Sequence, residues 1–250
     1  MKVVIIAAGY ATRMYPITLN TPKPLLPIGD STILSLLMEK VSSIIGISEC
    51  IIVSNHKFIN DFKDWRDNNK RNWLCSVKIM DDGTENNDER LGAVRDLLLV
   101  IEKYSINEDI LVLAADNLIE FSLVEFVNYA QEKNVSCIMY HEEKSIEKLQ
   151  RTGVIIIDNN KKVLDFQEKP LIPNSHFAVP PFYYIVSSDI PLIKECIENS
   201  NEYDALGNLA QYIYKHSILY AWSMNGRRID IGDLKTYKKI SKDYNQIDLH

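Results

Sequence analysis

Short apolar runs alternate with amphipathic segments along the first 140 residues of the chain. The runs consist of Val, Ile, Leu and Ala without polar alternation, which is typical of strands buried on both faces of a parallel sheet. Segments with apolar residues three or four positions apart predict the intervening helices, the first over about 33–45 with Ser31 or Thr32 as its cap. The expected strands cover residues 3–8, 50–53, 77–80, 110–115 and 135–140. This alternation predicts an α/β fold with a doubly wound, mostly parallel, Rossmann-like sheet.

The pattern changes at about residue 153. Residues 154–157 and 163–166 are apolar runs around an Asn-rich turn, which predicts a β-hairpin. We expect residues 182–186 to add another strand to this smaller, β-rich subregion. The remaining segments predict a helix after Pro191, a helix over about 209–214, a strand at 219–222 and a helix after Asp233.

The loop after the first strand has the composition of an anion-binding site. Small residues at Ala8, Gly9 and Ala11 let backbone amides approach a ligand closely, and Arg13 and Lys23 add two positive charges. An ordinary loop with two solvated bases is the alternative. Prolines on both sides of Lys23 favour the first interpretation, because they restrict the backbone around that lysine. The loop therefore predicts a cradle for a polyphosphate.

This loop also resembles the signature of the sugar-phosphate nucleotidylyltransferases, in particular those similar to glucose-1-phosphate thymidylyltransferase. The signature is G-x-(G/A)-T-R-(L/M)-x-P-(L/I)-T followed by P-K-P-L-x-P-(V/I), and it matches residues 9–18 and 22–28. Alanine stands at positions 8 and 11, where many members have glycine. The resemblance implies that the nucleotide is bound by Ala8, Gly9, Tyr10, Ala11, Thr12, Arg13 and Lys23.

Two aspartates are candidate metal ligands. Asp116 follows a predicted buried strand, and ligands of open α/β sheets bind beyond such strand ends. A carboxylate beside a triphosphate requires a cation between them, and Mg²⁺ commonly takes one or two carboxylates plus phosphate oxygens. The resemblance implies that Asp116 and Asp230, the latter in a D-I-G motif, both bind this ion. Asp116 could instead cap the next turn, and Asp233 is a candidate cap for the last helix.

Three further segments resemble family motifs. Glu168 and Lys169 stand in an E-K-P motif, where the resemblance implies contacts to the sugar hydroxyls and to the sugar phosphate. Gly153 resembles the glycine whose backbone approaches the sugar, and Gly92 falls where the family contacts the nucleotide. Because Lys169 precedes a proline, we expect an extended backbone there.

Together the motifs imply one nucleotidylyltransferase domain over residues 1–250. Its nucleotide-binding part covers about 1–150, its sugar-phosphate-binding part about 151–232, and a C-terminal helix and tail 233–250. The expected reaction joins a nucleoside triphosphate and a sugar 1-phosphate into a nucleotide-sugar and pyrophosphate, with Mg²⁺ as cofactor and Arg13, Lys23 and Lys169 as catalytic residues. Two alternatives remain open: a CTP-dependent enzyme acting on a phosphocholine- or phosphonate-type acceptor, and a catalytically silent sensing or scaffold subunit.

We expect a pyrimidine nucleotide, dTTP or UTP before CTP, as the donor. The resemblance supports this choice, and the methyl groups of Ala8 and Ala11 would favour the smaller ring in a tight pocket. Such size discrimination is limited to about 1–3 kcal/mol per methylene. Asp81 or Asp82, near the expected position of the base, could accept a hydrogen bond from cytosine.

Composition excludes several other classes of protein. A formal charge of −6 and the lack of a basic cluster argue against a nucleic-acid partner. No apolar segment reaches membrane-spanning length, and the first apolar run leads into a glycine loop, so we expect neither a membrane partner nor a signal peptide. Four scattered cysteines without a C-x-x-C pair fit a reducing, cytoplasmic location. The sequence leaves open whether the chain forms a homo-oligomer.

Overall fold

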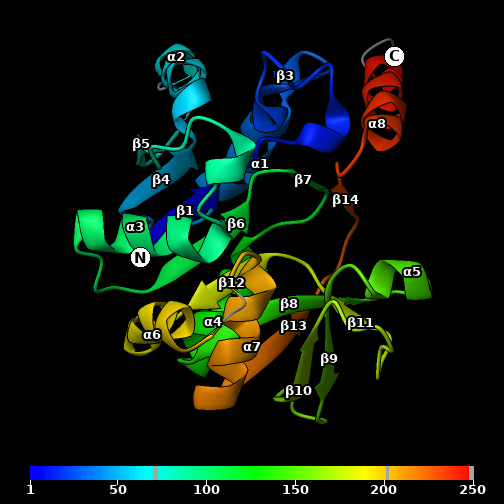
Figure 1. The fold of residues 1–250 in the computed structure, drawn as a ribbon. Coiled ribbons are helices and arrows are strands. Elements are labelled where there is room, and N and C mark those ends of the chain that lie inside the picture. Colours follow the sequence, from blue (N-terminus) through cyan, green and yellow to red (C-terminus); the bar gives the residue numbers. More distant parts are fainter. Residues whose placement is uncertain (70–72, 201–202, 248–250) are drawn as a thin grey trace. The chain divides into compact units, whose positions relative to one another are not determined.

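The computed structural model describes residues 1–69, 73–200 and 203–247, and these form two compact units. Unit 1 comprises Met1–Val4, Leu91–Leu113 and Val124–Asn225. Unit 2 comprises Ile5–Arg90, Ala114–Leu123 and Gly226–His250. Both units are therefore assembled from separate segments of the chain, whose elements are labelled in Figure 1. Each unit contains both helices and strands, which confirms the α/β class and the Rossmann-like sheet.

Unit 2 contains a parallel strand pair with its helices. Strand β4 (Glu49–Ser54) pairs in parallel with β5 (Ser76–Asp81), and every residue of β4 is buried, as the unalternating apolar run predicts. Helix α1 (Ile33–Ser42) begins after Thr32, whose side chain accepts a hydrogen bond from Ser35 N at 3.1 Å. Helix α2 (Ile59–Asn69) buries Ile59, Phe62 and Trp65.

In unit 2, a strand pair joins the segments Ala114–Leu123 and Gly226–His250. Strand β7 (Asn117–Ile119) pairs antiparallel with β14 (Arg228–Asp230), and short β2 (Pro27–Ile28) pairs with β3 (Ser31–Thr32). Helix α8 (Leu234–Ile247) follows β14, and Asp233 caps it by accepting a hydrogen bond from Thr236 N at 2.8 Å. One apolar cluster holds these elements together; its buried members are Met14, Leu26, Ile28, Ile33, Leu118, Ile231 and Ile240.

Unit 1 contains a mixed sheet with strand order β10-β9-β11-β8-β12-β6 and β13 beside β8. Its strands are β6 (Ile110–Ala114, of which Ala114 belongs to unit 2), β8 (Ser136–Glu142), β9 (Gly153–Ile157), β10 (Val163–Glu168), β11 (Phe177–Val179), β12 (Phe182–Ile185) and β13 (Leu219–Ser223). Its helices are α3 (Ala93–Tyr104), α4 (Val124–Lys133), α5 (Ile146–Leu149), α6 (Pro191–Asn199) and α7 (Leu206–His216). Strand β1 (Lys2–Ile6) has residues in both units.

The β9–β10 hairpin is confirmed, with Gly153 opposite Glu168 in the antiparallel register. The assignment of residues 182–186 to the hairpin subregion is wrong. Strand β12 instead pairs antiparallel with both β6 and β8, and β11 is the strand that pairs with β9. All four residues of β12 are buried, so an apolar run could not distinguish a position inside the larger sheet from one beside the hairpin.

Among the described residues, no helix combines the length and the apolarity needed to cross a lipid bilayer.

Candidate functional site

The pairing of β7 with β14 brings the two candidate metal ligands together in unit 2. Asp230 is opposite Asn117 in this pairing, and Ile231 N donates a hydrogen bond to the backbone oxygen of Asp116 at 3.0 Å. Two acidic residues far apart in the sequence therefore lie at one strand pair, Asp116 directly before β7 and Asp230 at the end of β14. Each follows or ends a strand, so both carboxylates are held on backbone that is fixed by hydrogen bonds.

Lys23 lies directly against this acidic pair. Its Nζ is 2.7 Å from Asp116 Oδ2, and only 12% of its side chain is exposed. The turn Lys23–Leu25 begins after Pro22 and is closed by a hydrogen bond from Leu25 N to Pro22 O at 2.9 Å. The prolines around Lys23 therefore hold its backbone in place, as the sequence predicts.

The pKa of Asp230 is raised from its ordinary value, first by desolvation and then by the negative charge of Asp116. The positive charges of Arg228, Lys23 and Arg13 oppose this rise in the pKa of Asp230. The side chain of Asp230 is exposed to solvent. The excess of negative charge between two carboxylates is the condition that a bound cation relieves.

Two residues that the sequence analysis did not select orient Asp116. Asn117 Nδ2 donates to Asp116 Oδ1 at 2.8 Å, and Arg228 Nη1 donates to Asn117 Oδ1 at 2.6 Å. Arg228 is two residues before Asp230 in the sequence and reaches Asp116 through Asn117. The adjacent Asp-Asn pair was visible in the sequence, but its link to Arg228 requires the β7–β14 pairing.

The first loop has the tight backbone expected of an anion cradle. Ala11 adopts a left-handed conformation (φ 48°, ψ 42°), which explains why glycine suits this position, and its oxygen accepts a hydrogen bond from Thr18 Oγ1 at 2.9 Å. Gly9 and Thr12 are exposed, as is Arg13 in the following turn. Ala8 is only 4% exposed, so its methyl group gives little support to the argument from ring size.

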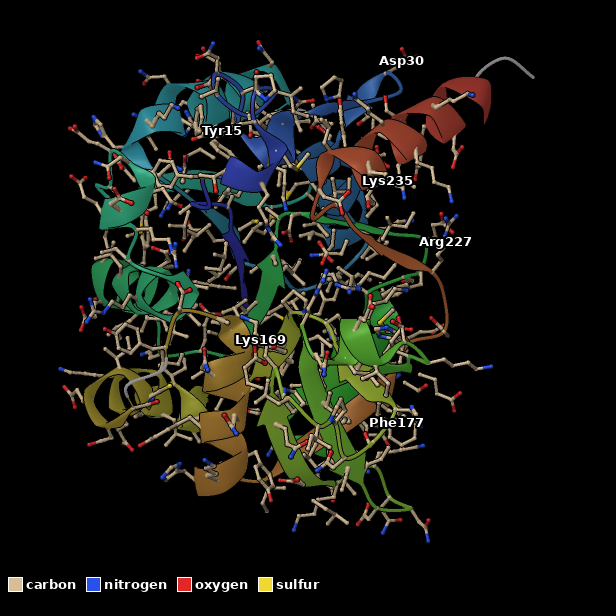
Figure 2. The ribbon with its side chains drawn as sticks, turned by 45° about the vertical axis from the view of Figure 1, so that its right-hand side comes forward. Tyr15, Asp30, Lys169, Phe177, Arg227 and Lys235 are labelled. Atoms are coloured by element: carbon tan, nitrogen blue, oxygen red, sulfur yellow. The ribbon has the colours of Figure 1, made fainter. Side chains whose placement is uncertain are left out.

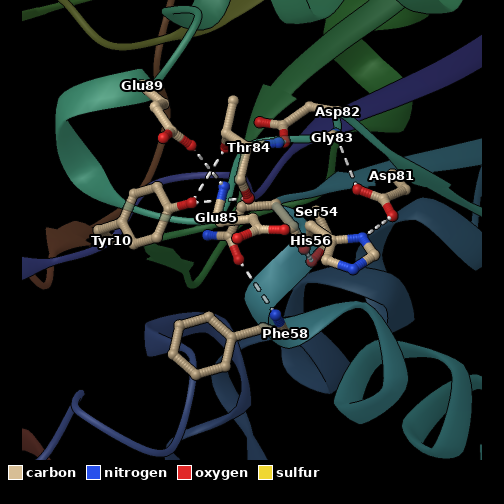
Figure 3. A network of polar contacts seen from close by, with 11 residues as sticks. Tyr10, Ser54, His56, Phe58, Asp81, Asp82, Gly83, Thr84, Glu85 and Glu89 are labelled. Carbon is tan, nitrogen blue, oxygen red and sulfur yellow. Dashed lines mark hydrogen bonds and ion pairs between the residues drawn. The ribbon is translucent and has the colours of Figure 1, made fainter.

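Tyr10 is buried and joins the first loop to the loop after β5 (Figure 3). Its hydroxyl donates to Thr84 O at 2.8 Å and lies 3.0 Å from Thr84 Oγ1. Asp82 Oδ1 in turn accepts hydrogen bonds from Thr84 N at 2.7 Å and Thr84 Oγ1 at 2.8 Å. The loop in which the sequence places a base contact is therefore fixed to the loop that carries the candidate phosphate-binding residues.

His56 pairs with Asp81, the residue next to Asp82 in the loop after β5. Its Nδ1 is 2.6 Å from Asp81 Oδ2, while Asp81 Oδ1 accepts a hydrogen bond from Gly83 N at 2.8 Å (Figure 3). The hydrogen bond and the charge of Asp81 raise the pKa of His56 above its ordinary value.

We expect the Asp81→Asn variant to return the pKa of His56 toward about 6.5. A pKa raised by folding means that the ion pair stabilises the protein below the unfolded-state pKa, and that this contribution is lost as the pH rises through the raised value. An NMR titration of the His56 ring measures the shift, with His56→Gln assigning the signal. Equal pKa values in both proteins would contradict the contact.

Unit 1 carries the remaining candidates. Gly92 precedes α3 with φ 89°, a conformation that favours glycine, and accepts a hydrogen bond from Asp96 N at 3.0 Å. Gly153 begins β9; a Cβ there would lie 2.7 Å from the ring of Phe166, so packing alone accounts for this glycine. Glu168 ends β10 with 8% of its side chain exposed.

Lys169 follows Glu168 and is labelled in Figure 2. Its Nζ is 3.7 Å from Glu168 Oε1, and 53% of its side chain is exposed. The expectation of an extended backbone is wrong, because Lys169 has φ 45°. Its N–H donates to Thr152 O at 3.1 Å, which holds this uncommon conformation at the end of the hairpin.

Comparison with known proteins assigns the chain to a family. A family model described as "Nucleotidyl transferase" matches residues 2–247. The chain belongs to this family. Among similar proteins, a UTP–glucose-1-phosphate uridylyltransferase of Synechocystis sp. is 26% identical over 95% of the chain and 61% of its own length. A glucose-1-phosphate adenylyltransferase of Fervidobacterium nodosum is also 26% identical, over 93% of the chain and 58% of its own length.

The chain therefore spans about three-fifths of the length of these two curated relatives. Their names specify different bases at the same level of identity, so overall similarity does not select the donor. A solved structure described as UDP-glucose pyrophosphorylase complexed with UDP-glucose has the same fold, with a TM-score of 0.82 at 23% identity, covering 98% of each chain.

The residues present fit a divalent cation bound together with phosphates. Across the described residues there is no group of three or more His, Cys, Asp or Glu side chains placed to enclose a metal. Mg²⁺ commonly binds to one or two carboxylates together with substrate phosphates and water, so the Asp116–Asp230 pair suits this ion. The contact of Lys23 with Asp116 indicates that this position attracts a cation.

Proposed function

We propose that this protein transfers a nucleotidyl group from a nucleoside triphosphate to a sugar 1-phosphate and releases pyrophosphate. The observation that supports this best is the Asp116–Asp230 pair with Lys23 and Arg13 acting on it. Two carboxylates and two cations in one place suit a reaction in which crowded phosphates must be aligned and neutralised. Family membership and the E-K-P segment support a sugar phosphate as acceptor.

In this reaction an oxygen of the sugar phosphate attacks the α-phosphorus, and the bond from that phosphorus to the bridging oxygen of pyrophosphate breaks. A phosphate monoester has a second pKa of about 6 and is mostly dianionic at neutral pH. The attacking phosphate therefore needs no side-chain base to remove a proton. We assign Arg13 to the leaving pyrophosphate, Lys23 to the nucleotide phosphates and Lys169 to the attacking phosphate. Main-chain groups at Gly9, Thr12 and Gly92 would approach the nucleotide, and those at Gly153 the sugar.

Asp116 and Asp230 would hold Mg²⁺, which supplies neutralisation of phosphate charge when bound. Asn117 and Arg228 would keep Asp116 in the orientation seen here. Lys23 would have to release Asp116 partly when the ion binds, because its ammonium group lies on that carboxylate. We also propose a reducing, cytoplasmic setting, supported by four cysteines that are all free thiols.

A pyrophosphate-release assay tests this proposal with dTTP, UTP, CTP, ATP and GTP against a panel of sugar 1-phosphates and phosphocholine. We expect turnover with glucose 1-phosphate and a pyrimidine nucleotide, dTTP or UTP before CTP. A preference for ATP or GTP would contradict the choice of base. Turnover of CTP with phosphocholine would favour the second enzyme class, and no turnover with any pair would favour a sensing or scaffold subunit.

A further inference from the structure

Gly207 lies directly against the carboxylate of Glu168. A Cβ at Gly207 would be 1.8 Å from Glu168 Oε2 and 2.4 Å from its Cδ, well inside van der Waals contact. Backbone conformation does not explain this glycine, because the φ angle of Gly207 is not positive. The carboxylate therefore occupies the volume that any side chain at this position would need.

The first turn of α7 meets Glu168 because the helix runs beside β10 (Figure 1). Gln211 Nε2 donates to Phe166 O at 3.1 Å, and Tyr214 OH donates to Leu164 O at 2.5 Å. These contacts fix the helix along the strand, so the carboxylate at the strand end lies over the helix N-terminus. The positive end of the helix dipole favours a carboxylate in that position.

The segment before α7 is also fixed to the start of α3. Ala93 N donates to Asp204 O at 2.8 Å, and a Cβ at Gly92 would lie 2.9 Å from Asp204 Oδ1. Within unit 1, residues 204–207 thus touch Gly92 at one end and Glu168 at the other. Asn208 Oδ1 accepts a hydrogen bond from Ala205 N at 3.0 Å, which stiffens the segment between the two contacts.

We propose that Gly207 is a positioning residue for the acceptor: by lacking a side chain, it admits the Glu168 carboxylate onto the first turn of α7 and so sets the direction in which Glu168 meets the sugar hydroxyls. This inference rests on the proposed function. A role in folding alone is the competing explanation. The two differ in their consequences, because the atoms in the way are the end of a rotatable side chain. The Gly207→Ala protein can fold by turning that carboxylate aside.

Steady-state kinetics of Gly207→Ala test the proposal. We expect the KM for the sugar 1-phosphate to rise about tenfold, equivalent to the loss of one well-placed hydrogen bond, while the KM for the nucleotide changes less than about twofold. Gln211→Ala is the matched control, since it weakens the packing of α7 on β10 without touching the carboxylate. It should lower the Tm and leave both KM values near those of the unaltered protein.

A shorter carboxylate makes the test specific. Glu168→Asp shortens the side chain by one methylene, which we expect to leave room for a methyl group at position 207. Adding Gly207→Ala to it should then change the acceptor KM less than about twofold further. An unchanged acceptor KM in Gly207→Ala, or full additivity in the double variant, would overturn the proposal.

Thermal unfolding separates this proposal from the proposed function. In the Glu168→Ala background, Gly207→Ala should raise the Tm because alanine favours the helix, whereas next to Glu168 it should not. Equal Tm changes in both backgrounds would disprove the contact and with it the positioning role. Failure of the proposed function would instead appear as no pyrophosphate release by the unaltered protein with any substrate pair.

Discussion

Asp116→Asn and Asp230→Asn are each expected to lower kcat by about 10²–10³-fold, the usual cost of removing one preorganised electrostatic contact. Each substitution keeps the size of the side chain and removes the charge that would hold a divalent cation. The fold should persist, because β7 and β14 pair through backbone groups and the neighbouring cluster is apolar. Initial rates at saturating Mg²⁺ and both substrates, together with circular dichroism, measure the two expectations.

Asp233→Asn provides the matched control for these variants. This substitution removes the same charge three residues after Asp230, but the side chain of Asp233 caps α8. Asparagine is as good a cap as aspartate, so we expect stability to change little and kcat to stay within about twofold. Turnover near that of the unaltered protein in Asp116→Asn or Asp230→Asn would remove that residue from the proposed metal site. A defect in Asp233→Asn equal to theirs would indicate a general effect of charge.

The elements predicted best are those whose evidence is local. The strand at residues 50–53, the helix capped by Thr32 and the hairpin at 154–166 follow from periodicity, capping and turn composition, and the structure has all three. Side-chain roles that depend only on neighbouring residues in the sequence can also be predicted. Asp233 was a candidate cap from its position before a helix, and it is one.

Features that depend on long-range pairing could not be predicted in the same way. Strand β7 has three residues, too few for a periodic pattern, and its partner β14 lies more than a hundred residues later. Their pairing is what places Asp230 beside Asp116 and lets Arg228 reach Asn117. The placement of β12 and the contact of Gly207 with Glu168 likewise depend on which elements pack together.

Backbone strain was missed for a different reason. The preference of a residue before proline for extended geometry is an average, and at Lys169 the hydrogen bond of its N–H with Thr152 O holds a positive φ instead. Such a conformation costs about 1–3 kcal/mol and persists only where surrounding contacts maintain it. Its occurrence at a residue that the sequence also selects by motif strengthens the case for Lys169 as a functional residue.

The two candidate lysines are expected to act on different substrates. We expect Lys23→Met to weaken nucleotide binding about 10- to 100-fold, and Lys169→Met to raise the KM for the sugar phosphate by a similar factor with little effect on the nucleotide. These factors correspond to one charge-assisted hydrogen bond of about 1.5–3 kcal/mol. Methionine keeps most of the aliphatic stem, which matters at Lys23, whose side chain is only 12% exposed.

Equilibrium binding of the nucleotide alone separates the two lysines, because it does not depend on turnover. Lys148→Met is the control, since Lys148 is an exposed lysine of unit 1 whose Nζ is 3.0 Å from Glu143 Oε2. Its substitution should change neither nucleotide binding nor the KM for the sugar phosphate. Lys23→Met also removes the cation that lies on Asp116, so its defect should shrink as Mg²⁺ is raised if the ion can take over that charge. Lys169 is in unit 1 and Lys23 in unit 2, each fixed by contacts within its own unit. Equal weakening of nucleotide binding by both substitutions would disprove this division between nucleotide and acceptor.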